Sequence, residues 1–319
     1  MIRNSISVAR GGLRFSRLLL LLIAASILLL CPRPNQAADL AATTAPAEGE
    51  AQEESLTEVN KKLTNPVSSI WSLSFQQNNY YLDNPDRWQS NLQFQPVMPV
   101  ALTKEWNLIT RPVFQLFNST PFPDVEVNPR TGVPTVEIER TVGFGDIILL
   151  EMFSPSPAIA GNWLLGIGPT FIFPAASSDF TGQGKWQAGP GALVGYLSKG
   201  WILGAFVQNW TSFAGDSNRP GTNQMNLQPI AALFFGEGWS IGYSGNILAN
   251  WEAGSDNVWT VPIGLDINKV VKLGKLPVKF GLAGQYMPIH PDSFGQHWNI
   301  QVSITPVIPK LIHGTLFGE

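Results

Sequence analysis

The chain has 319 residues, with 20 lysines and arginines against 23 aspartates and glutamates, and charged residues make up 13% of it. That share is about half of what soluble domains carry, and a net charge of −3 excludes the basic surface that binds nucleic acid. One cysteine, Cys31, and three histidines show no spacing typical of a zinc or iron–sulfur site, so we expect no metal and no other cofactor.

The N-terminus predicts export. Four arginines precede an apolar run at residues 18–30, and the small pair Ala37-Ala38 follows. This order is typical of a secretory signal peptide, and the run is shorter than the roughly 20 residues of a membrane helix. We therefore expect residues 1–38 to be a cleaved signal peptide. Lipoprotein processing at Cys31 is an alternative that the following Pro32 fits poorly.

A linker and a short helix are expected next. Residues 39–54 are rich in Ala, Thr and Glu, which is typical of a disordered acidic linker. Between Glu53 and Leu63 the apolar residues form one helical stripe, and Asn65-Pro66 ends it. We interpret residues 39–66 as a tether that contains a short helix. The alternative is a plug or lid for the domain that follows, but one short stripe favours the tether.

From residue 70 the chain alternates with a period of two. In 223–235 one face carries Met225, Leu227, Pro229, Ala231, Leu233 and Phe235 and the other carries Gln224, Asn226 and Gln228, and after the Gly236–Gly238 turn the arm at 239–251 alternates again. Such arms exceed the usual soluble strand of about 5–6 residues and match the roughly 9–11 residues of a strand that crosses a bilayer. We expect twelve arms, at 70–81, 87–101, 104–117, 141–153, 161–174, 185–197, 201–213, 223–235, 239–251, 257–270, 276–288 and 297–308.

The links between the arms alternate in length. The short links are Leu102–Thr103, Ser198–Gly200, Gly236–Gly238 and Leu273–Lys275. The long links are Asn118–Arg140, Ala175–Gly184, Ala214–Thr222 and Pro288–Gln296. An even number of strands with short turns on the periplasmic side and long loops outside is typical of outer-membrane barrels. We therefore predict an all-β fold, a transmembrane antiparallel up-and-down β-barrel over residues 67–309, with residues 310–319 as a C-terminal tail.

Tryptophans mark both ends of the predicted arms. Those at the short-turn side are Trp71, Trp106, Trp163, Trp201 and Trp239. Those at the long-loop side are Trp88, Trp186, Trp210, Trp251, Trp259 and Trp298. Indole rings prefer the membrane–water boundary, so we expect two aromatic girdles. A soluble β core, the alternative, would scatter tryptophan along the strands.

Polar residues on the inward faces are the candidates for contact with a solute. They are Glu105, Asn107, Arg111, Gln228, Asn246, Asp266, Lys279, Gln285 and Gln301, with Gln93, Gln95 and Asn268 beside them. A charge that faces lipid near the midplane costs roughly 2–4 kcal/mol, which favours the inward assignment. The alternative is that these charges pair with one another and only fill the interior. Asp146 and Glu151 differ in parity on one arm, and the pattern leaves open which of them faces inward.

The predicted lumen is narrow and partly apolar. A barrel of about twelve strands is narrower than the water-filled porins of 16–18 strands. Ile109, Leu164, Ile172 and Leu248 are expected to face inward. This combination suits small amphipathic or aromatic solutes.

Catalysis has little support in the sequence. The histidines lie near the C-terminus, and Ser293, which is close to His290, sits in a Pro/Asp/Gly loop without an evident third residue to orient the ring. Loop histidines are more often solvated than catalytic. We therefore expect the protein not to be an enzyme.

The chain also resembles a bacterial family of outer-membrane barrels, the MetA-pathway-of-phenol-degradation-like transporters, some of which carry the name neuromedin U. The resemblance rests on Lys62–Val67, Ser74–Asn78, Gln95–Val97, Trp106–Arg111, Gly143–Asp146, Phe153–Pro155, Gly166–Pro169, Gly189-Pro190, Trp210–Gly215, Leu227–Pro229 and Trp259–Ile263. It implies an exported barrel that transports aromatic or hydrophobic compounds, and it carries over no binding residues. Unlike many barrels, the chain continues past its last arm from Lys310 to Glu319, so an aromatic signal for the barrel-assembly machinery would fall to Phe317.

The sequence thus predicts an outer-membrane channel or transporter of a Gram-negative-type envelope that passes small solutes, aromatic or hydrophobic ones among them. The expected partners are the lipid bilayer, lipopolysaccharide, the barrel-assembly machinery and a small-molecule solute. The alternative is a non-conducting structural or adhesive barrel that acts through its extracellular loops, above all the link Asn118–Arg140.

Overall fold

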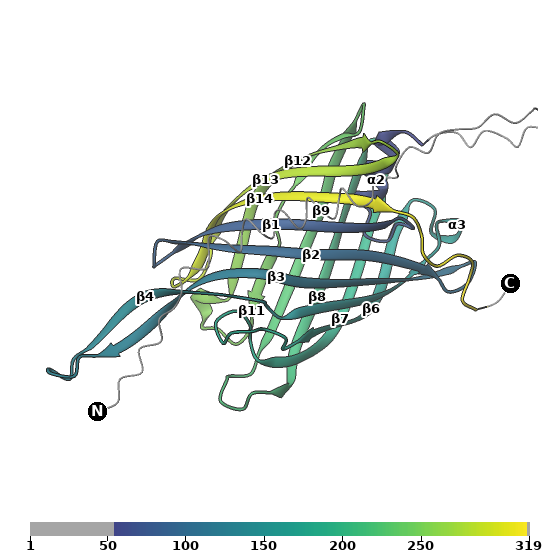
Figure 1. The fold of residues 1–319 in the computed structure, drawn as a ribbon. Coiled ribbons are helices and arrows are strands. Elements are labelled where there is room, and N and C mark those ends of the chain that lie inside the picture. The colour runs from purple at the N-terminus through teal and green to yellow at the C-terminus, as the bar shows by residue number, and fades with distance from the viewer. Residues whose placement is uncertain (1–53, 318–319) are drawn as a thin grey trace, which may run out of the picture. The chain divides into compact units, whose positions relative to one another are not determined.

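Fourteen strand segments and three short helices make up residues 54–317, the part of the chain that the computed structural model describes (Figure 1). The strands are β1 (Trp71–Asp83), β2 (Arg87–Ala101), β3 (Trp106–Val127), β4 (Pro134–Gly143), β5 (Ile147–Pro155), β6 (Trp163–Phe173), β7 (Lys185–Leu197), β8 (Trp201–Gly215), β9 (Asn223–Phe235), β10 (Trp239–Tyr243), β11 (Ile247–Asn250), β12 (Trp259–Leu273), β13 (Leu276–Ile289) and β14 (Gly295–Ile308). The helices are α2 (Leu56–Thr64), α3 (Pro157–Ala160) and the 3-10 helix η1 (Ser255–Asn257). The predicted signal peptide and most of the acidic linker lie outside the described residues.

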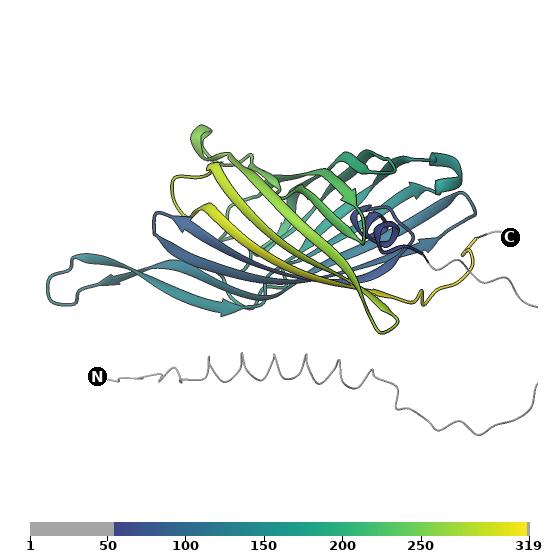
Figure 2. The same ribbon diagram turned by 90° about the horizontal axis from the view of Figure 1, so that it is seen from above.

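The strands pair antiparallel in one sheet, and the sheet closes because β14 pairs with β1. β4 and β5 belong to one arm that is interrupted at residues 144–146, and β10 and β11 belong to another that is interrupted at 244–246. The described residues therefore form a closed barrel of twelve spans, which confirms the predicted fold, and α2 lies at its short-turn end (Figure 2). No helix among residues 54–317 is long and apolar enough to cross a membrane.

The predicted loop Asn118–Arg140 is instead mostly a hairpin. β3 continues to Val127 and pairs with β4 from Asn118↔Gly143 to Val127↔Pro134, so that the two strands project beyond the barrel wall (Figure 1). At its tip the Asn128 carboxamide oxygen accepts hydrogen bonds from the backbone N–H groups of Arg130 and Thr131. The four prolines in this stretch indicated a loop, but a two-stranded ribbon leaves every second N–H unpaired and so accommodates proline.

The outer face of the barrel is an exposed apolar band. On β14 the side chains of Ile300, Val302 and Ile304 are exposed, whereas Asn299, the residue before them, is buried. On β13 the exposed fraction of Leu282 is 59%, while that of its neighbour Ala283 is 4%. Monomeric soluble proteins rarely expose a continuous apolar surface of this extent, whereas a bilayer covers it without cost.

Nine of the eleven tryptophans are exposed at the ends of the strands, with exposed fractions between 38% for Trp259 and 55% for Trp163. The expectation is wrong for the other two. Trp71 is buried and donates its indole N–H to the carbonyl oxygen of Pro99 at 2.8 Å. Trp210 is buried beside Thr170, whose hydroxyl oxygen accepts its indole N–H at 2.9 Å. Both indole groups are satisfied within the protein, so these two rings do not belong to the girdles.

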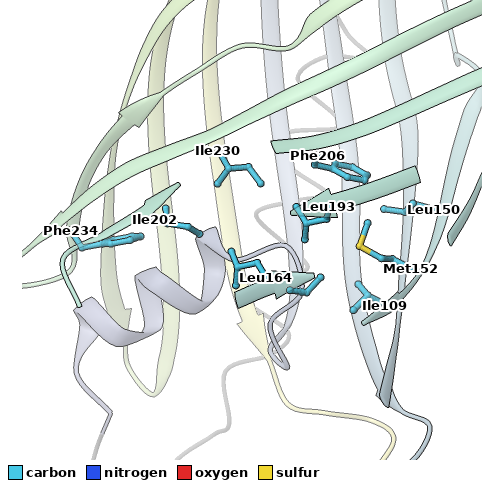
Figure 3. Close-up of a cluster of buried hydrophobic side chains, with 10 residues drawn as sticks. Ile109, Leu150, Met152, Leu164, Leu193, Ile202, Phe206, Ile230 and Phe234 are labelled. Atoms are coloured by element: carbon cyan, nitrogen blue, oxygen red, sulfur yellow. The ribbon is translucent and has the colours of Figure 1, made fainter. Parts of the chain in front are cut away.

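An apolar cluster lines one inner wall of the barrel (Figure 3). It consists of Ile109, Leu150, Met152, Leu164, Leu193, Ile202, Phe206, Ile230 and Phe234, together with Val67 from the segment after α2. These residues come from β3, β5 and the strands up to β9. The interior therefore has an apolar side, and it faces the polar inner surfaces of the remaining strands.

Candidate functional site: the barrel lumen

Two adjoining cavities occupy the lumen, with volumes of about 230 Å³ and 280 Å³. The first is lined by residues near the short-turn ends of the strands, such as Ser72 and Thr305. The second extends toward the long-loop ends and is lined by Tyr80 and Met287 among others. Because they share lining residues, the cavities lie in series along the barrel.

The residues that line both cavities form a belt between them. The belt consists of Gln76, Gln95, Arg111, Gln228, Pro229, Tyr243, Asp266 and Gln301. Six of these eight side chains end in an amide or a charged group. Any solute that moves from one cavity to the other passes the belt, so the belt is the candidate site for recognition.

The two charged members of the belt stand on different walls. Arg111, on β3, donates an Nη2 hydrogen bond to Gln95 Oε1 at 2.8 Å, and its buried Nε has no hydrogen-bond partner among the described residues. Asp266, on β12, accepts a hydrogen bond at Oδ2 from Asn268 at 2.8 Å, while its Oδ1 is buried without a partner in the described part. By the shorter way around the barrel four strands lie between β3 and β12, so a positive and a negative group face the lumen from nearly opposite sides.

The structure places most of the sequence-predicted residues at the cavities. Arg111, Gln228, Asp266 and Gln301 line both; Lys279 and Asn268 line the first; Gln93, Asn246 and Gln285 line the second. Asn107 lies on the inward side of β3, two positions before Ile109, and lines neither cavity. Glu105 is an exception, because it is exposed in the turn before β3 and is not a lumen residue.

Three belt residues were missed from the sequence. Pro229 was assigned to the apolar face of its arm. Gln76 alternates with apolar residues on β1, so the signal for it was present. Tyr243 occupies an odd position on an arm whose even positions face inward, but the strand ends there and its hydroxyl donates to Pro262 O at 2.8 Å. The interruption continues through Gly245, where φ is +133° and a Cβ would lie 2.4 Å from Pro262 Cγ. Beyond such a break, the period of two in the sequence no longer predicts which face a side chain lies on.

The open question of Asp146 and Glu151 is resolved by the link between β4 and β5. Asp146 is buried in this link, and its carboxylate accepts backbone N–H groups from Ala176 and Gln183, which holds the loop at 174–184 in place. Burial raises the pKa of the Asp146 carboxyl, against the opposing effects of these hydrogen bonds and of the Arg219 charge. Glu151 lies between the inward Leu150 and Met152, so it faces outward, where it accepts a hydrogen bond from Thr110.

Helix α2 is bound to the inner rim of the barrel and is not a free tether. Asn60 is fully buried and donates from Nδ2 to Gly238 O at 2.9 Å and to Ser240 Oγ at 3.0 Å. Lys279, on β13, donates to Thr64 Oγ1 at 2.9 Å. Residues 62–66, at the end of α2 and just beyond it, line the first cavity. α2 is therefore docked at the barrel mouth and is not a free tether, and its action as a plug or lid stays a prediction.

The sequence around α2 favours a helix of this length. Ser55 caps it by accepting the Glu58 backbone N–H at 3.2 Å, and Asn65 ends it in an extended conformation. Val59 lies on the predicted apolar stripe and is buried, but the fully buried side chain in the next position is the amide of Asn60. An apolar stripe alone did not show which face would dock, because the docking contacts are polar.

The closed barrel with its apolar outer band and the tryptophans at both ends defines an integral outer-membrane β-barrel, since transmembrane barrels of this kind are outer-membrane structures. No protein-family model matches the sequence, and no curated protein matches it significantly.

Among solved structures, the chain is similar to an outer membrane channel from Pseudomonas putida F1, with 12% identity over 75% of this chain and 94% of that chain and a TM-score of 0.50. A BenF-like porin from Pseudomonas fluorescens Pf-5 has 9% identity, coverage of 74% and 97% and a TM-score of 0.23. A bacterial polysaccharide outer membrane secretin has 10% identity, coverage of 76% and 99% and a TM-score of 0.30. The likeness to the Pseudomonas putida channel concerns the fold alone, and the other two scores are too low to support an argument.

Proposed function

We propose that the protein is an outer-membrane channel that passes small solutes through its lumen. The observation that carries the proposal is the belt, where Arg111 Nε and Asp266 Oδ1 are buried in the cavity wall without protein partners among residues 54–317. A buried polar group without a partner costs about 1–3 kcal/mol, so a filled interior whose charges neutralise each other would pair them. Both side chains line the two cavities, so a small rotation that exposes these atoms would let a solute supply the missing hydrogen bonds.

The walls of the second cavity support a preference for amphipathic solutes. Leu150 and Phe206 belong both to the apolar cluster and to the lining of this cavity, whereas Gln93 and Arg111 line it with polar groups. An aromatic ring could lie against the apolar side while a carboxylate or hydroxyl group binds Arg111. The sequence resemblance to phenol-degradation-type transporters agrees with this solute class, and we propose small aromatic acids or phenols as the cargo.

Uptake by liposomes tests this proposal. The refolded mature protein should let benzoate enter faster than a neutral sugar of similar size, because only benzoate matches both the apolar wall and the Arg111 guanidinium. Uptake is measured by liposome swelling, alongside single-channel conductance in planar bilayers. If neither the full-length protein nor a variant without α2 conducts ions or admits either solute, the channel proposal is wrong.

The projecting β3–β4 hairpin supports a second candidate, a barrel that acts by binding a surface partner. Its side chains Val125, Val127, Val133 and Val136 have exposed fractions between 57% and 63%. Replacing residues 122–139 by a two-residue turn removes this surface and leaves the pairing of β3 with β5 intact. We expect solute uptake to be unchanged in this variant. A loss of cell-surface adhesion with no measurable uptake by either protein would favour the adhesive function instead.

A further inference from the structure

Three side chains that are far apart in the sequence meet at the long-loop rim of the barrel. They are Asp83 at the end of β1, His290 directly after β13 and His297 on β14. One ligand atom from each lies within 4.8 Å of the others, and His290 Nε2 is 3.8 Å from Asp83 Oδ2. The rings of the two histidines are 5.3 Å apart between centroids. All three side chains are partly buried.

A β-bulge directs His297 toward the other two side chains. In the pairing of β1 with β14, Tyr81 is opposite Trp298 and Leu82 is opposite Gln296, so His297 is the extra residue without a partner on β1. Bulges of this kind re-aim a side chain out of the regular alternation. The bulge lies at the seam where the first and last strands close the barrel.

The loops around the cluster hold His290 in place. Phe294 donates its backbone N–H to Asn84 O at 3.0 Å, which joins the β13–β14 loop to the β1–β2 turn. Asp292 donates its backbone N–H to Asn257 Oδ1 at 2.7 Å, which joins the same loop to η1. At Gly295 a Cβ would lie 2.0 Å from Pro291 O and 2.5 Å from His290 Nδ1, so only glycine fits beneath the ring.

The tautomer of His290 leaves a lone pair free on the side of the cluster. Its Nδ1 is 3.0 Å from the carbonyl oxygen of Pro291, which can only accept a hydrogen bond, so Nδ1 carries the proton. In the neutral ring Nε2 is then unprotonated, and Nε2 is the atom beside the Asp83 carboxylate. Metal-binding histidines have this arrangement, with one nitrogen on the metal and the other donating to a carbonyl or carboxylate.

We propose that Asp83, His290 and His297 bind one divalent transition-metal ion of the Zn²⁺, Ni²⁺ or Cu²⁺ type. Two imidazoles and a carboxylate favour these ions over Mg²⁺ or Ca²⁺, which prefer oxygen ligands. Ligand atoms around a tetrahedral zinc ion are about 3.3 Å apart, given bonds of about 2.0 Å, so modest side-chain rotations complete the site. The Asp83 side chain is 45% exposed, which leaves a path of entry and room for water as a further ligand.

A bound ion at this site would overturn the expectation of no metal, which rested on the absence of a typical ligand spacing. Spacing rules detect ligands that are neighbours on one element, whereas Asp83 and His290 are brought together only by closure of the barrel. A bound ion would join β1 to β14 and the end of β13 at the seam. Because the ion would bind the folded barrel and not the unfolded chain, it would also stabilise the barrel against unfolding.

The test uses the mature protein without a polyhistidine tag, refolded in detergent. Binding of Co²⁺ is followed by visible absorption and binding of Zn²⁺ by calorimetry, and unfolding is followed by circular dichroism. We expect one ion per chain and a higher Tm with Zn²⁺. His290→Ala, His297→Gln and Asp83→Asn should each weaken binding at least tenfold and abolish the Tm shift. His313→Ala is the matched control, because His313 is exposed in the tail away from the cluster, and it should bind as the unaltered protein does.

Three results would overturn the proposal. The first is no saturable binding of Co²⁺ or Zn²⁺ by the folded, unaltered protein. The second is unchanged binding in a variant that combines His297→Gln with Asp83→Asn, two near-isosteric changes on the ends of strands that should leave the fold intact. The third is a loss of binding in His313→Ala equal to that in His290→Ala. Channel activity does not enter the test, so its outcome is independent of the proposed function.

Discussion

Deletion of residues 56–64 is expected to increase the single-channel conductance severalfold, because α2 lies against the short-turn mouth and residues just beyond its end line the first cavity. Without the helix, Lys279 loses its contact with Thr64, and its ammonium group would add a positive charge to the open mouth. The measurement is conductance of single channels in planar bilayers at fixed salt. An unchanged conductance would mean that α2 does not control passage.

A milder variant tests the docking of α2 without removing the helix. Asn60→Ala removes the two hydrogen bonds to Gly238 and Ser240 but keeps the helix. At about 0.5–1.5 kcal/mol for each bond, the undocked population should increase roughly tenfold. The matched control is Glu58→Gln, which breaks the ion pair with Lys61 inside the helix and lines neither cavity, so its conductance should equal that of the unaltered protein. Equal conductance in the two variants would contradict docking through Asn60.

Removing the charge of either charged belt residue should change ion selectivity, and the two substitutions should change it in opposite directions. Arg111→Gln should lower the permeability of anions relative to cations about tenfold, and Asp266→Asn should lower that of cations by a similar factor. A unit charge about 5 Å from a passing ion contributes on the order of 3 kcal/mol at an effective dielectric constant of about 20, and part of this is lost to screening by salt. Selectivity is measured as the reversal potential in a salt gradient.

The control for this experiment removes an equal charge outside the lumen. Lys269, on β12, lies over the ring of Trp239 at 4.9 Å from its centroid and near Glu237, and it lines neither cavity. Lys269→Gln should therefore leave the reversal potential unchanged. If Arg111→Gln also leaves it unchanged, or if Lys269→Gln shifts it equally, ions do not pass the belt and the proposed route is wrong. Benzoate uptake should fall with Arg111→Gln and not with Lys269→Gln.

The twelve spans could be predicted from the sequence because apolar residues that face lipid alternate with polar residues that face the lumen. The arm predicted at 223–235 coincides with β9, and that at 276–288 differs from β13 by one residue. The inward positions of Arg111, Asp266 and Gln301 follow from the same alternation, because a strand has only two faces. Each of these inferences uses neighbouring residues alone.

The prediction was wrong where the local pattern is broken or where a group finds its partner far away in the chain. Trp71 and Trp210 stand at the ends of strands like the other tryptophans, yet acceptors on other strands draw their indole N–H groups into the protein. Tyr243 faces the lumen because the strand is interrupted after it. Neither a distant acceptor nor a break in the strand changes the period of the sequence.

The sequence by itself therefore determined the barrel, its number of spans and the inner face of most strands, because these depend on a period of two that the spans repeat. Only the tertiary structure decided that α2 docks in the barrel mouth, that Arg111 and Asp266 face one passage from different walls, and that Asp83 meets His290 and His297 at the rim. The physical reason is closure. Pairing β1 with β14 brings residues from both ends of the chain within a few ångströms, and no local pattern records that proximity.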